Sequence, residues 1–289
     1  MSAFPASALA TARRGEARPI AIITGASSGI GRELAELFAR NGHDLMLIAR
    51  RRDALESIAR ILSDRYGITC DPFAADLARR LERERLASRI RTIDHHVAAL
   101  VNNAGIGTHG YFHETDLERE LEIIELNIAA LTHLTKLVLP GMLARGAGRI
   151  VNVSSVAAFQ PGPLMSVYYA SKAYVQSFSE ALSEETSGSG VTVTAVCPGP
   201  TASEFQTASG LHPNAPTVGA PLMTSREVAE LAYRGATGGK RVVVTGLRNK
   251  IVVLANRLLS RRRMTRLVRR LQERRREASL ATRGPTPHG

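Results

Sequence analysis

Short apolar runs rich in β-branched residues alternate along the chain with longer stretches of helical periodicity. The first run, residues 20–24, precedes a stretch in which Leu34, Leu37 and Phe38 recur on one helical face. This alternation is typical of βαβ units and predicts an α/β fold with a doubly wound, seven-stranded, mainly parallel sheet. The strands are expected near residues 20–24, 44–49, 68–74, 97–101, 148–154, 191–196 and 241–245. The longest helices are expected near residues 116–145 and 165–186.

The segments outside this pattern divide the chain of 289 residues. We expect a flexible leader at 1–17, one α/β domain at 18–247, a basic amphipathic helical extension at 248–276 and a disordered tail at 277–289. The leader lacks the apolar core of a signal peptide, but its Ala, Ser and Arg content leaves an organelle transit peptide open. No run approaches the ~20 apolar residues of a membrane span. Two cysteines, Cys70 and Cys197, suggest a reducing compartment, so a cytoplasmic protein is expected.

The basic character of the chain is concentrated in the extension. Residues 248–276 contain 12 Arg or Lys and one acidic residue, Glu273, a net charge of +11, whereas the whole chain carries +12. Apolar positions recur with helical spacing but change phase across 260–263, which predicts two short amphipathic helices. Such helices are typical of peripheral contact with an anionic membrane; packing against the substrate loop with a solvated Arg face is the alternative. Nucleic acid is not expected, because no aromatic residue or known binding motif accompanies the charge.

A Gly-rich turn, TGASSGIG at 24–31, lies between the first strand and the first helix. Backbone N–H groups at such a helix N-terminus form an anion site. Gly25 allows the tight turn, Gly29 lets the backbone approach a pyrophosphate, and Gly31 lets the helix pack on the strand. The sequence therefore predicts a dinucleotide-binding turn, with a spacing that differs from G-x-G-x-x-G.

Tyr168 and Lys172 lie at i and i+4 on the predicted helix at 165–186, with Ser155 thirteen residues before Tyr168. Residues at this spacing share a helical face, whereas the neighbouring Tyr169 is expected to point elsewhere. A buried ammonium beside a phenol favours the phenolate, so we expect Lys172 to lower the pKa of Tyr168. Such a phenol suits general acid–base catalysis, with Ser155 hydrogen-bonding the same substrate oxygen.

These features together resemble the short-chain dehydrogenase/reductase family, in its roughly 250-residue single-domain, NADP(H)-preferring branch. The resemblance covers about residues 18 to 247. It is carried by TGASSGIG, NNAG at 102–105, Asn127, Ser155, Tyr168 with Lys172, and PG at 198–199. It implies a Rossmann fold and an oxidoreductase.

The resemblance also implies the site residues. Tyr168 is the general acid–base, Ser155 positions the substrate oxygen, Lys172 holds the nicotinamide ribose, and Asn127 supports a water through a helix kink. The implied cofactor contacts are Gly25, Ser27, Ser28, Gly29, Ile30, Gly31, Arg50, Arg51, Asp76, Leu77, Asn103, Ala104, Gly105, Tyr168, Lys172, Pro198, Gly199 and Thr201. Thr201 departs from the family's commoner PG-x-x-x-T spacing.

The cofactor follows from the end of the second strand, LMLIARRRD. An NAD-specific protein offers an acidic residue to the ribose 2′-hydroxyl there, whereas this chain offers Arg50 and Arg51. A guanidinium matches a 2′-phosphate, so NADP(H) is predicted, with Arg50 as the main contact and Arg51 as an auxiliary one. A solvated basic turn is the alternative. The eight histidines lack ligand spacing, and no metal site is predicted.

The Pro- and Gly-rich segment 198–223 follows the sixth strand, where doubly wound sheets bind ligands, and Thr224 to Glu227 resembles a capping box. Its small apolar residues, with Phe205 and Leu211 as expected pocket walls, favour a hydrophobic carbonyl or alcohol substrate. The predicted protein is an NADPH-dependent carbonyl reductase or alcohol dehydrogenase. The family resemblance also implies a homo-oligomer (dimer or tetramer), since members of the family usually pair through the helices that correspond to those near 116–145 and 165–186. A catalytically idle NADP(H)-binding regulator and a membrane- or polyanion-binding adaptor are the alternatives.

Overall fold

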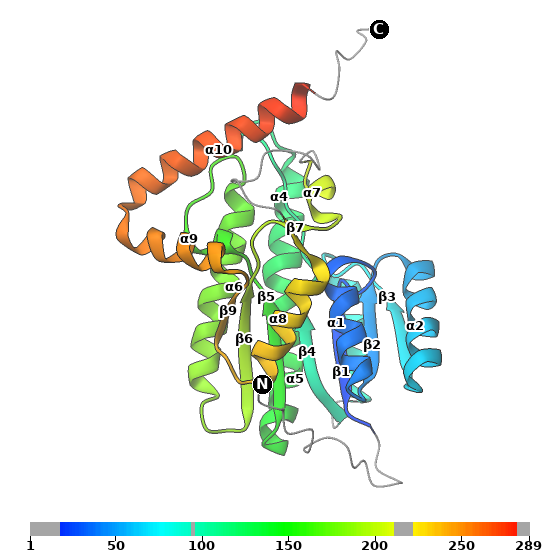
Figure 1. Ribbon diagram of the computed structural model, residues 1–289. Helices are drawn as coiled ribbons and strands as arrows, with labels where there is room; N and C mark the ends of the chain where they lie inside the picture. The colour runs from blue at the N-terminus through cyan, green and yellow to red at the C-terminus, as the bar shows by residue number, and fades with distance from the viewer. Residues whose placement is uncertain (1–17, 94–95, 211–221, 282–289) are drawn as a thin grey trace, which may run out of the picture.

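Seven parallel strands form the central sheet of the computed structural model, which describes residues 18–93, 96–210 and 222–281. Their order is β3-β2-β1-β4-β5-β6-β9, and every neighbouring pair is parallel. The strands are β1 (Ile20–Thr24), β2 (Asp44–Ala49), β3 (Cys70–Ala74), β4 (Val97–Asn102), β5 (Gly148–Val153), β6 (Val191–Cys197) and β9 (Val242–Val244). The order reverses between β1 and β4, where doubly wound sheets open a crevice at the carboxyl ends of their strands. The predicted Rossmann fold is confirmed (Figure 1).

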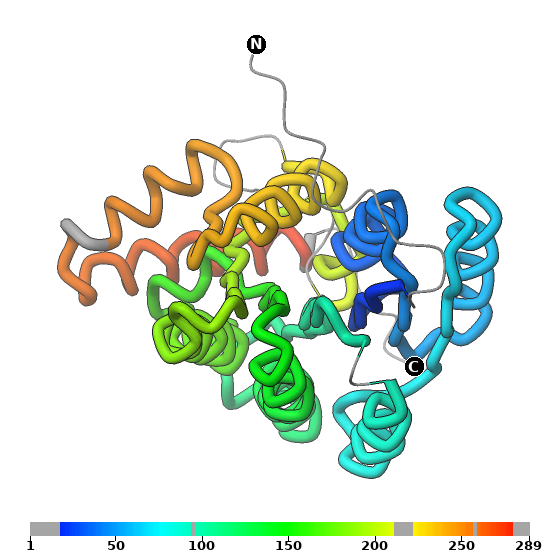
Figure 2. Tube along the Cα trace, turned by 90° about the horizontal axis from the view of Figure 1, so that it is seen from below, coloured from blue at the N-terminus to red at the C-terminus, as the bar shows by residue number. Residues whose placement is uncertain are grey.

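Helices cover both faces of this sheet. The helical elements are α1 (Gly29–Arg40), α2 (Arg52–Tyr66), α3 (Arg80–Arg91), α4 (Leu117–Ile124), the π-helix η2 (Glu125–Ala130), α5 (Leu131–Arg145), the 3-10 helix η3 (Val156–Phe159), α6 (Ser166–Glu185), α7 (Phe205–Ala208), α8 (Ser225–Thr237), α9 (Leu247–Leu258) and α10 (Arg261–Ala281). One face is covered by α1, α2 and α8, and the other by α3, α5 and α6 (Figure 2).

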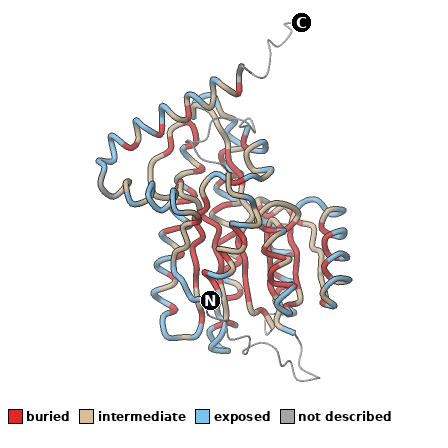
Figure 3. Tube along the Cα trace, viewed as in Figure 1, coloured by how far each residue is buried: buried red, intermediate tan, exposed pale blue. Residues whose placement is uncertain are grey.

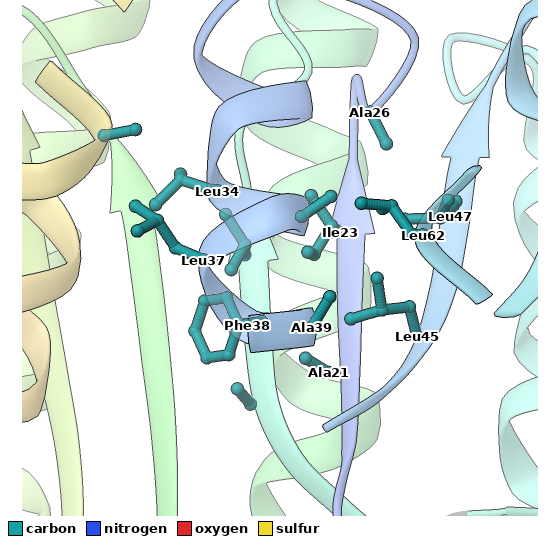
Figure 4. Packing of buried hydrophobic residues seen from close by; sticks show 14 of the residues in the cluster. Ala21, Ile23, Ala26, Leu34, Leu37, Phe38, Ala39, Leu45, Leu47 and Leu62 are labelled. Carbon is teal, nitrogen blue, oxygen red and sulfur yellow. The ribbon is translucent and has the colours of Figure 1, made fainter. Parts of the chain in front are cut away.

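The predicted apolar face of α1 is the one that enters the core. Leu34, Leu37 and Phe38 are buried in the same cluster as Ile23 of β1 and Leu47 of β2 (Figure 4). Each fully buried side chain of this size contributes ~1.5–3 kcal/mol, before the cost in conformational entropy. This packing fixes the N-terminus of α1 above the end of β1, where the Gly-rich turn lies.

The helical run Leu117–Arg145 is long and apolar enough to cross a membrane, by length and composition only. In the fold this is a core helix: Leu134, Val138 and Met142 are buried with residues of β4 and β5.

The segment expected as a loop at 198–223 contains regular structure where it is described. A two-stranded parallel sheet joins β7 (Thr201–Ala202) to β8 (Met223–Thr224), and α7 follows β7. Thr224 and Glu227 form the predicted capping box at the start of α8. Leu211, an expected pocket wall, lies outside the described residues.

The C-terminal extension folds into the two predicted helices, α9 and α10, which meet where the apolar phase changes. α10 lies across the carboxyl-end side of the sheet, with its outer face exposed (Figures 1 and 3). It continues to Ala281, so residues 277–281 are helical and the prediction of disorder from residue 277 is wrong for them. The reason is that Ser279 is still on the buried face of the helix. Residues 1–17 and 282–289 lie outside the described residues.

Candidate active site

A cavity of about 520 Å³ lies at the carboxyl ends of the strands, and the predicted Gly-rich turn forms one wall of it. Gly25 and Gly29 have φ of +65° and +56°, which a residue with a side chain rarely adopts. A Cβ at Gly31 would lie 2.3 Å from the carbonyl oxygen of Gly25. The lining also includes Ser27, Ser28 and Ile30, whereas Gly31, a predicted cofactor contact, is buried under the turn and does not line the cavity.

The end of β4 is tied to the Gly-rich turn by hydrogen bonds. Thr24 Oγ1 accepts from the backbone N–H groups of Asn103 and Ala104, at 2.9 and 3.0 Å. The Asn103 amide donates to the carbonyl oxygens of Thr24 and Gly25. Ala104 and Gly105 then line the cavity. These contacts bring NNAG beside the turn, as the resemblance implies, and they hold the two loops as one surface.

Arg50 and Arg51 line the same end of the cavity, together with Asp76 and Leu77. Arg51 donates to the Glu204 carboxylate at 2.8 Å and to Ser27 Oγ at 3.2 Å, while Arg50 lies 3.4 Å from Glu122. Arg51 lowers the pKa of Glu204 by hydrogen bonding. The two guanidiniums are therefore exposed but held in place by carboxylates, and Arg51 is nearer the Gly-rich turn.

Two further hydrogen bonds lie at this end. Asp76 Oδ1 accepts from the backbone N–H of Ala78 at 3.1 Å. Ser28 Oγ donates to Glu204 at 3.0 Å, so the loop after β6 reaches back to the turn after β1.

Asn127 lies in the π-helix η2, where the helix is locally widened. Its side chain accepts from the N–H of Ile106 and donates to the carbonyl oxygen of Ile106 and to Ser171 Oγ, each at 3.0 Å. A Cβ at Gly105 would lie 3.2 Å from Asn127 Oδ1 and 3.3 Å from Lys172 Nζ. The buried amide is thus fully engaged, and it lies next to the ammonium of Lys172.

Tyr168 and Ser155 meet in the cavity. Burial raises the pKa of Tyr168, while a hydrogen bond with Ser155 lowers it. Ser155 Oγ also accepts from the N–H of Ala157 at 3.1 Å, which makes it the N-cap of η3. Phe205 packs against Tyr168 with ring centroids 5.2 Å apart, so it is the pocket wall that the sequence predicts.

The surroundings of Lys172 differ from the prediction that its ammonium lowers the pKa of Tyr168. Its Nζ donates to the carbonyl oxygen of Val153 at 2.9 Å and lies 5.8 Å from the centre of the Tyr168 ring. Burial lowers the pKa of Lys172 to about 8. The expected lowering of the Tyr168 pKa by the ammonium is not found, because the ammonium bonds to the backbone and burial favours the neutral form of both groups.

The loop after β6 completes the cavity wall with Pro198, Gly199 and Thr201. Thr201 is buried and donates to the carbonyl oxygen of Gly199 at 2.9 Å. A Cβ at Gly199 would lie 2.3 Å from Asn249 Nδ2, so the glycine allows α9 to approach the loop.

The cavity residues that the sequence-based prediction does not include as site residues include Tyr169, Glu204, Gln272 and Arg275. Tyr169 was expected to point elsewhere, but the cavity extends around the first turn of α6, so two adjacent residues reach it. The Tyr168 and Tyr169 rings are 6.0 Å apart and nearly perpendicular. No signal in the sequence finds Gln272 and Arg275, because they come from α10 and meet α6 only in the folded chain.

The cavity fits a dinucleotide. Glycines at 25, 29 and 31 leave the space that side chains would fill, and the turn ends at the N-terminus of α1, where anions bind. Across the described ranges, no group of three or more His, Cys, Asp or Glu side chains is placed to hold a metal ion.

A family model described as short chain dehydrogenase matches residues 19–213. The very-long-chain 3-oxoacyl-CoA reductase of Anas platyrhynchos is 38% identical over 184 residues, which cover 62% of this chain and 58% of that protein. The hydroxysteroid dehydrogenase-like protein 1 of Gallus gallus is 36% identical over 180 residues, covering 62% and 54%. The chain therefore spans somewhat more than half the length of these relatives.

Two solved structures are similar over most of the chain. A short-chain dehydrogenase from Sphingobium yanoikuyae in complex with NADPH is 37% identical, with a TM-score of 0.76 over 83% of this chain and 94% of that one. The bulky-bulky ketone specific alcohol dehydrogenase from Comamonas testosteroni is 31% identical, with a TM-score of 0.71 over 83% and 92%.

Proposed function

Because the chain belongs to the short-chain dehydrogenase family, we propose that it is an NADPH-dependent reductase of hydrophobic carbonyl compounds. As a member of this family it is an oxidoreductase with a nicotinamide cofactor. The observation that carries the proposal is the meeting of Ser155, Tyr168 and Lys172 in one cavity with the Gly-rich turn. A binding protein without catalysis has no need of a buried proton donor at this position.

The residues of the cavity divide the chemistry among them. The nicotinamide, when bound, supplies the hydride. Tyr168 donates its proton to the carbonyl oxygen of the substrate, and Ser155 positions that oxygen by a hydrogen bond. Burial keeps the phenol protonated, as a proton donor requires. Asn127 and Lys172 lie together beside Gly105 and replace the proton through water supported by the widened helix η2.

The cofactor half of the cavity holds the dinucleotide. The backbone of the turn from Gly25 to Gly31 binds the pyrophosphate, and Lys172 holds the nicotinamide ribose. Arg50 and Arg51 bind the 2′-phosphate, which favours NADPH over NADH. Asp76 and Leu77 would contact the adenine, and the backbone of Asn103, Ala104 and Gly105 would hold the cofactor. The loop with Pro198, Gly199 and Thr201 would contact the nicotinamide.

The substrate is a hydrophobic ketone or the corresponding secondary alcohol. Phe205, Met165 and Ala157 form an apolar wall around Tyr168. The names of similar proteins, a very-long-chain 3-oxoacyl-CoA reductase and a bulky-bulky ketone specific alcohol dehydrogenase, agree with a carbonyl that carries large apolar groups.

NADPH oxidation by the full-length chain, followed by absorbance over a panel of apolar ketones, tests this function. Turnover that disappears in Tyr168→Phe, with NADPH binding retained, is the expected result. Tight NADPH binding without turnover of any ketone would instead favour the idle regulator.

We further propose that the enzyme is a homo-oligomer that contacts anionic membrane peripherally. Large exposed side chains, as a subunit interface between these helices requires, lie on α4 (Leu117, Leu121 and Ile124) and on α6 (Tyr174).

The proposed membrane contact lies on α9, where Leu247, Ile251 and Leu254 are 73, 59 and 59% exposed at helical spacing. They lie in the segment with a net charge of +11, which supports contact with anionic lipid. A cytoplasmic enzyme that docks on a membrane accounts for both surfaces.

A further inference from the structure

Aromatic side chains gather around the phenol of Tyr168. Aromatic residues make up only 4% of the chain, yet Tyr168, Tyr169 and Phe205 all line the same cavity. The Phe205 ring is tilted by 42° to the Tyr168 ring, with the centroids 5.2 Å apart. The Tyr169 ring is tilted by 76°, with its centroid 6.0 Å away. Both arrangements lie in the range of attractive aromatic pairs, so the proposed proton donor has two aromatic rings as neighbours.

The ring of Tyr169 is held in place, and its polar atom is already used inside the protein. Its hydroxyl accepts a hydrogen bond from Gln272 Nε2 at 3.1 Å and also hydrogen-bonds to Gln160. A Cβ at Gly162 would lie 2.1 Å from Tyr169 Cγ, so the backbone before α6 packs closely against the ring. What Tyr169 offers to a bound substrate is therefore its ring rather than its hydroxyl.

Phe205 is placed by a glycine in the loop after β4. A Cβ at Gly107 would lie 3.2 Å from both Phe205 Cζ and Tyr168 Cδ2, so the bare backbone there lies against both rings. Phe205 and Tyr169 remain partly exposed, whereas Ala157 and Met165 in the same cluster are buried. The two rings are therefore the part of this cluster that a substrate can touch.

The composition of the cluster favours an aromatic substrate over an aliphatic one. Among the described residues, no Leu, Ile or Val belongs to it: its members are a methyl group, a thioether and three rings. A planar ring gains edge-to-face or offset contacts with other rings and a favourable contact with a thioether, beyond the burial of its surface. Conjugation also keeps a carbonyl in the plane of an attached ring. Walls that hold the ring would therefore orient the carbonyl toward Tyr168 and Ser155.

We propose that Tyr169 and Phe205 form an aromatic wall that selects ketones whose carbonyl carbon is bonded directly to an aromatic ring. This inference rests on the proposed reductase function and narrows its substrate class to aryl ketones and the corresponding benzylic alcohols. Tyr169 and Phe205 are then specificity-determining residues and take no part in proton transfer.

The test compares propiophenone with cyclohexyl ethyl ketone, which has the same carbon skeleton but a saturated ring. Both are assayed on the full-length protein with NADPH. Because the two ketones differ in intrinsic reactivity, the measured quantity is the change on substitution in the ratio of their kcat/KM values. Phe205→Leu keeps an apolar side chain but removes the ring, so it should lower the ratio of aryl to cyclohexyl ketone about 2- to 10-fold, the value of one aromatic pair. The control is Phe112→Leu, a ring 62% exposed outside the cavity lining, which should leave the ratio unchanged.

A second position separates the ring from its hydroxyl. Tyr169→Phe keeps the ring and should keep the ratio, whereas Tyr169→Leu should lower it. Isothermal titration of both ketones into the protein with NADP⁺ reports binding without turnover. If neither ketone is reduced but propiophenone binding depends on Phe205, the aromatic wall is supported and the reductase function is contradicted. If both ketones are reduced and the ratio is the same in the wild type and in both Leu variants, the aromatic wall is overturned and the reductase function stands.

Discussion

The cofactor half and the substrate half of the cavity are built in different ways. The cofactor half consists of turns that directly follow β1, β2, β3 and β4, and most of its surface is backbone. The substrate half consists of side chains from α6, α7 and α10, which are far apart in the sequence and come together only in the fold. Tyr169 and Gln272, which are hydrogen-bonded, are 103 residues apart.

This difference explains which interactions each half uses. A turn between a strand and a helix presents N–H groups and glycine space wherever the strand ends, so a short motif is enough to form it. A wall of side chains needs each helix to be placed by its own packing. Ligand specificity is therefore easier to change in the substrate half, and cofactor chemistry is tied to the sheet.

The first prediction tests the point where the halves meet. Tyr168→Phe should lower kcat by ~10²–10⁴, because a proton donor of this kind typically contributes that factor. NADPH affinity, measured by fluorescence titration, should change little, since the turn after β1 is untouched. Tyr174→Phe, an exposed tyrosine on the same helix, is the control. A Tyr168 variant that keeps more than half of the wild-type kcat would remove the residue from its proposed role.

The second prediction concerns the buried ammonium that both halves share. The pKa of Lys172 is lowered to about 8 from an ordinary 10.5, so the unfolded chain binds more protons between these values. The destabilisation by Lys172 is complete below pH 8 and disappears as the pH approaches 10.5. Lys172→Met should therefore raise the free energy of unfolding at pH 7 by up to about 3 kcal/mol, and the gain should shrink above pH 8.

Urea denaturation between pH 6 and 11 measures this change in the free energy of unfolding. The control Lys136→Met, exposed on α5, should stay within about 0.5 kcal/mol. A gain that is independent of pH would mean that packing of the methionine, rather than the cost of the buried charge, is responsible.

The third prediction tests the cofactor half alone. Arg50→Ala and Arg51→Ala should each weaken NADPH binding by about 1.5–3 kcal/mol and leave NADH binding nearly unchanged, because only NADPH carries the 2′-phosphate. Arg51 is held by Glu204 and Ser27 next to the Gly-rich turn, so its effect should be at least as large as that of Arg50. Equal losses for both cofactors would contradict the phosphate assignment, and Arg52→Ala, an exposed residue of α2, is the control.

The cofactor half of the cavity could be predicted from the sequence to a greater extent than the substrate half. The strands, the Gly-rich turn and the pairing of Tyr168 with Lys172 depend on residues close in sequence, and the sequence predicts where they lie. The electrostatics of Tyr168 could not be predicted, because they depend on burial and on the bond from Lys172 to Val153. Gln272 and Arg275 could not be assigned, because the charge of the extension hides which face of α10 is buried.

The last prediction separates the two helices of the extension. α10 buries Met264 and Val268, whereas α9 leaves Leu247, Ile251 and Leu254 exposed. If α9 docks on a membrane, Leu254→Ser should weaken binding to vesicles containing phosphatidylserine by about 1–2 kcal/mol, roughly the value of one partly buried Leu. Leu81→Ser, at a position 78% exposed on α3, should have no effect. Co-sedimentation measures both, and binding of the wild type should fall steeply with salt because each cation contributes ~1 kcal/mol within a Debye length. Wild-type protein that stays in the supernatant at low salt would mean that α9 meets no lipid, and its exposed leucines would then be assigned to contacts between subunits.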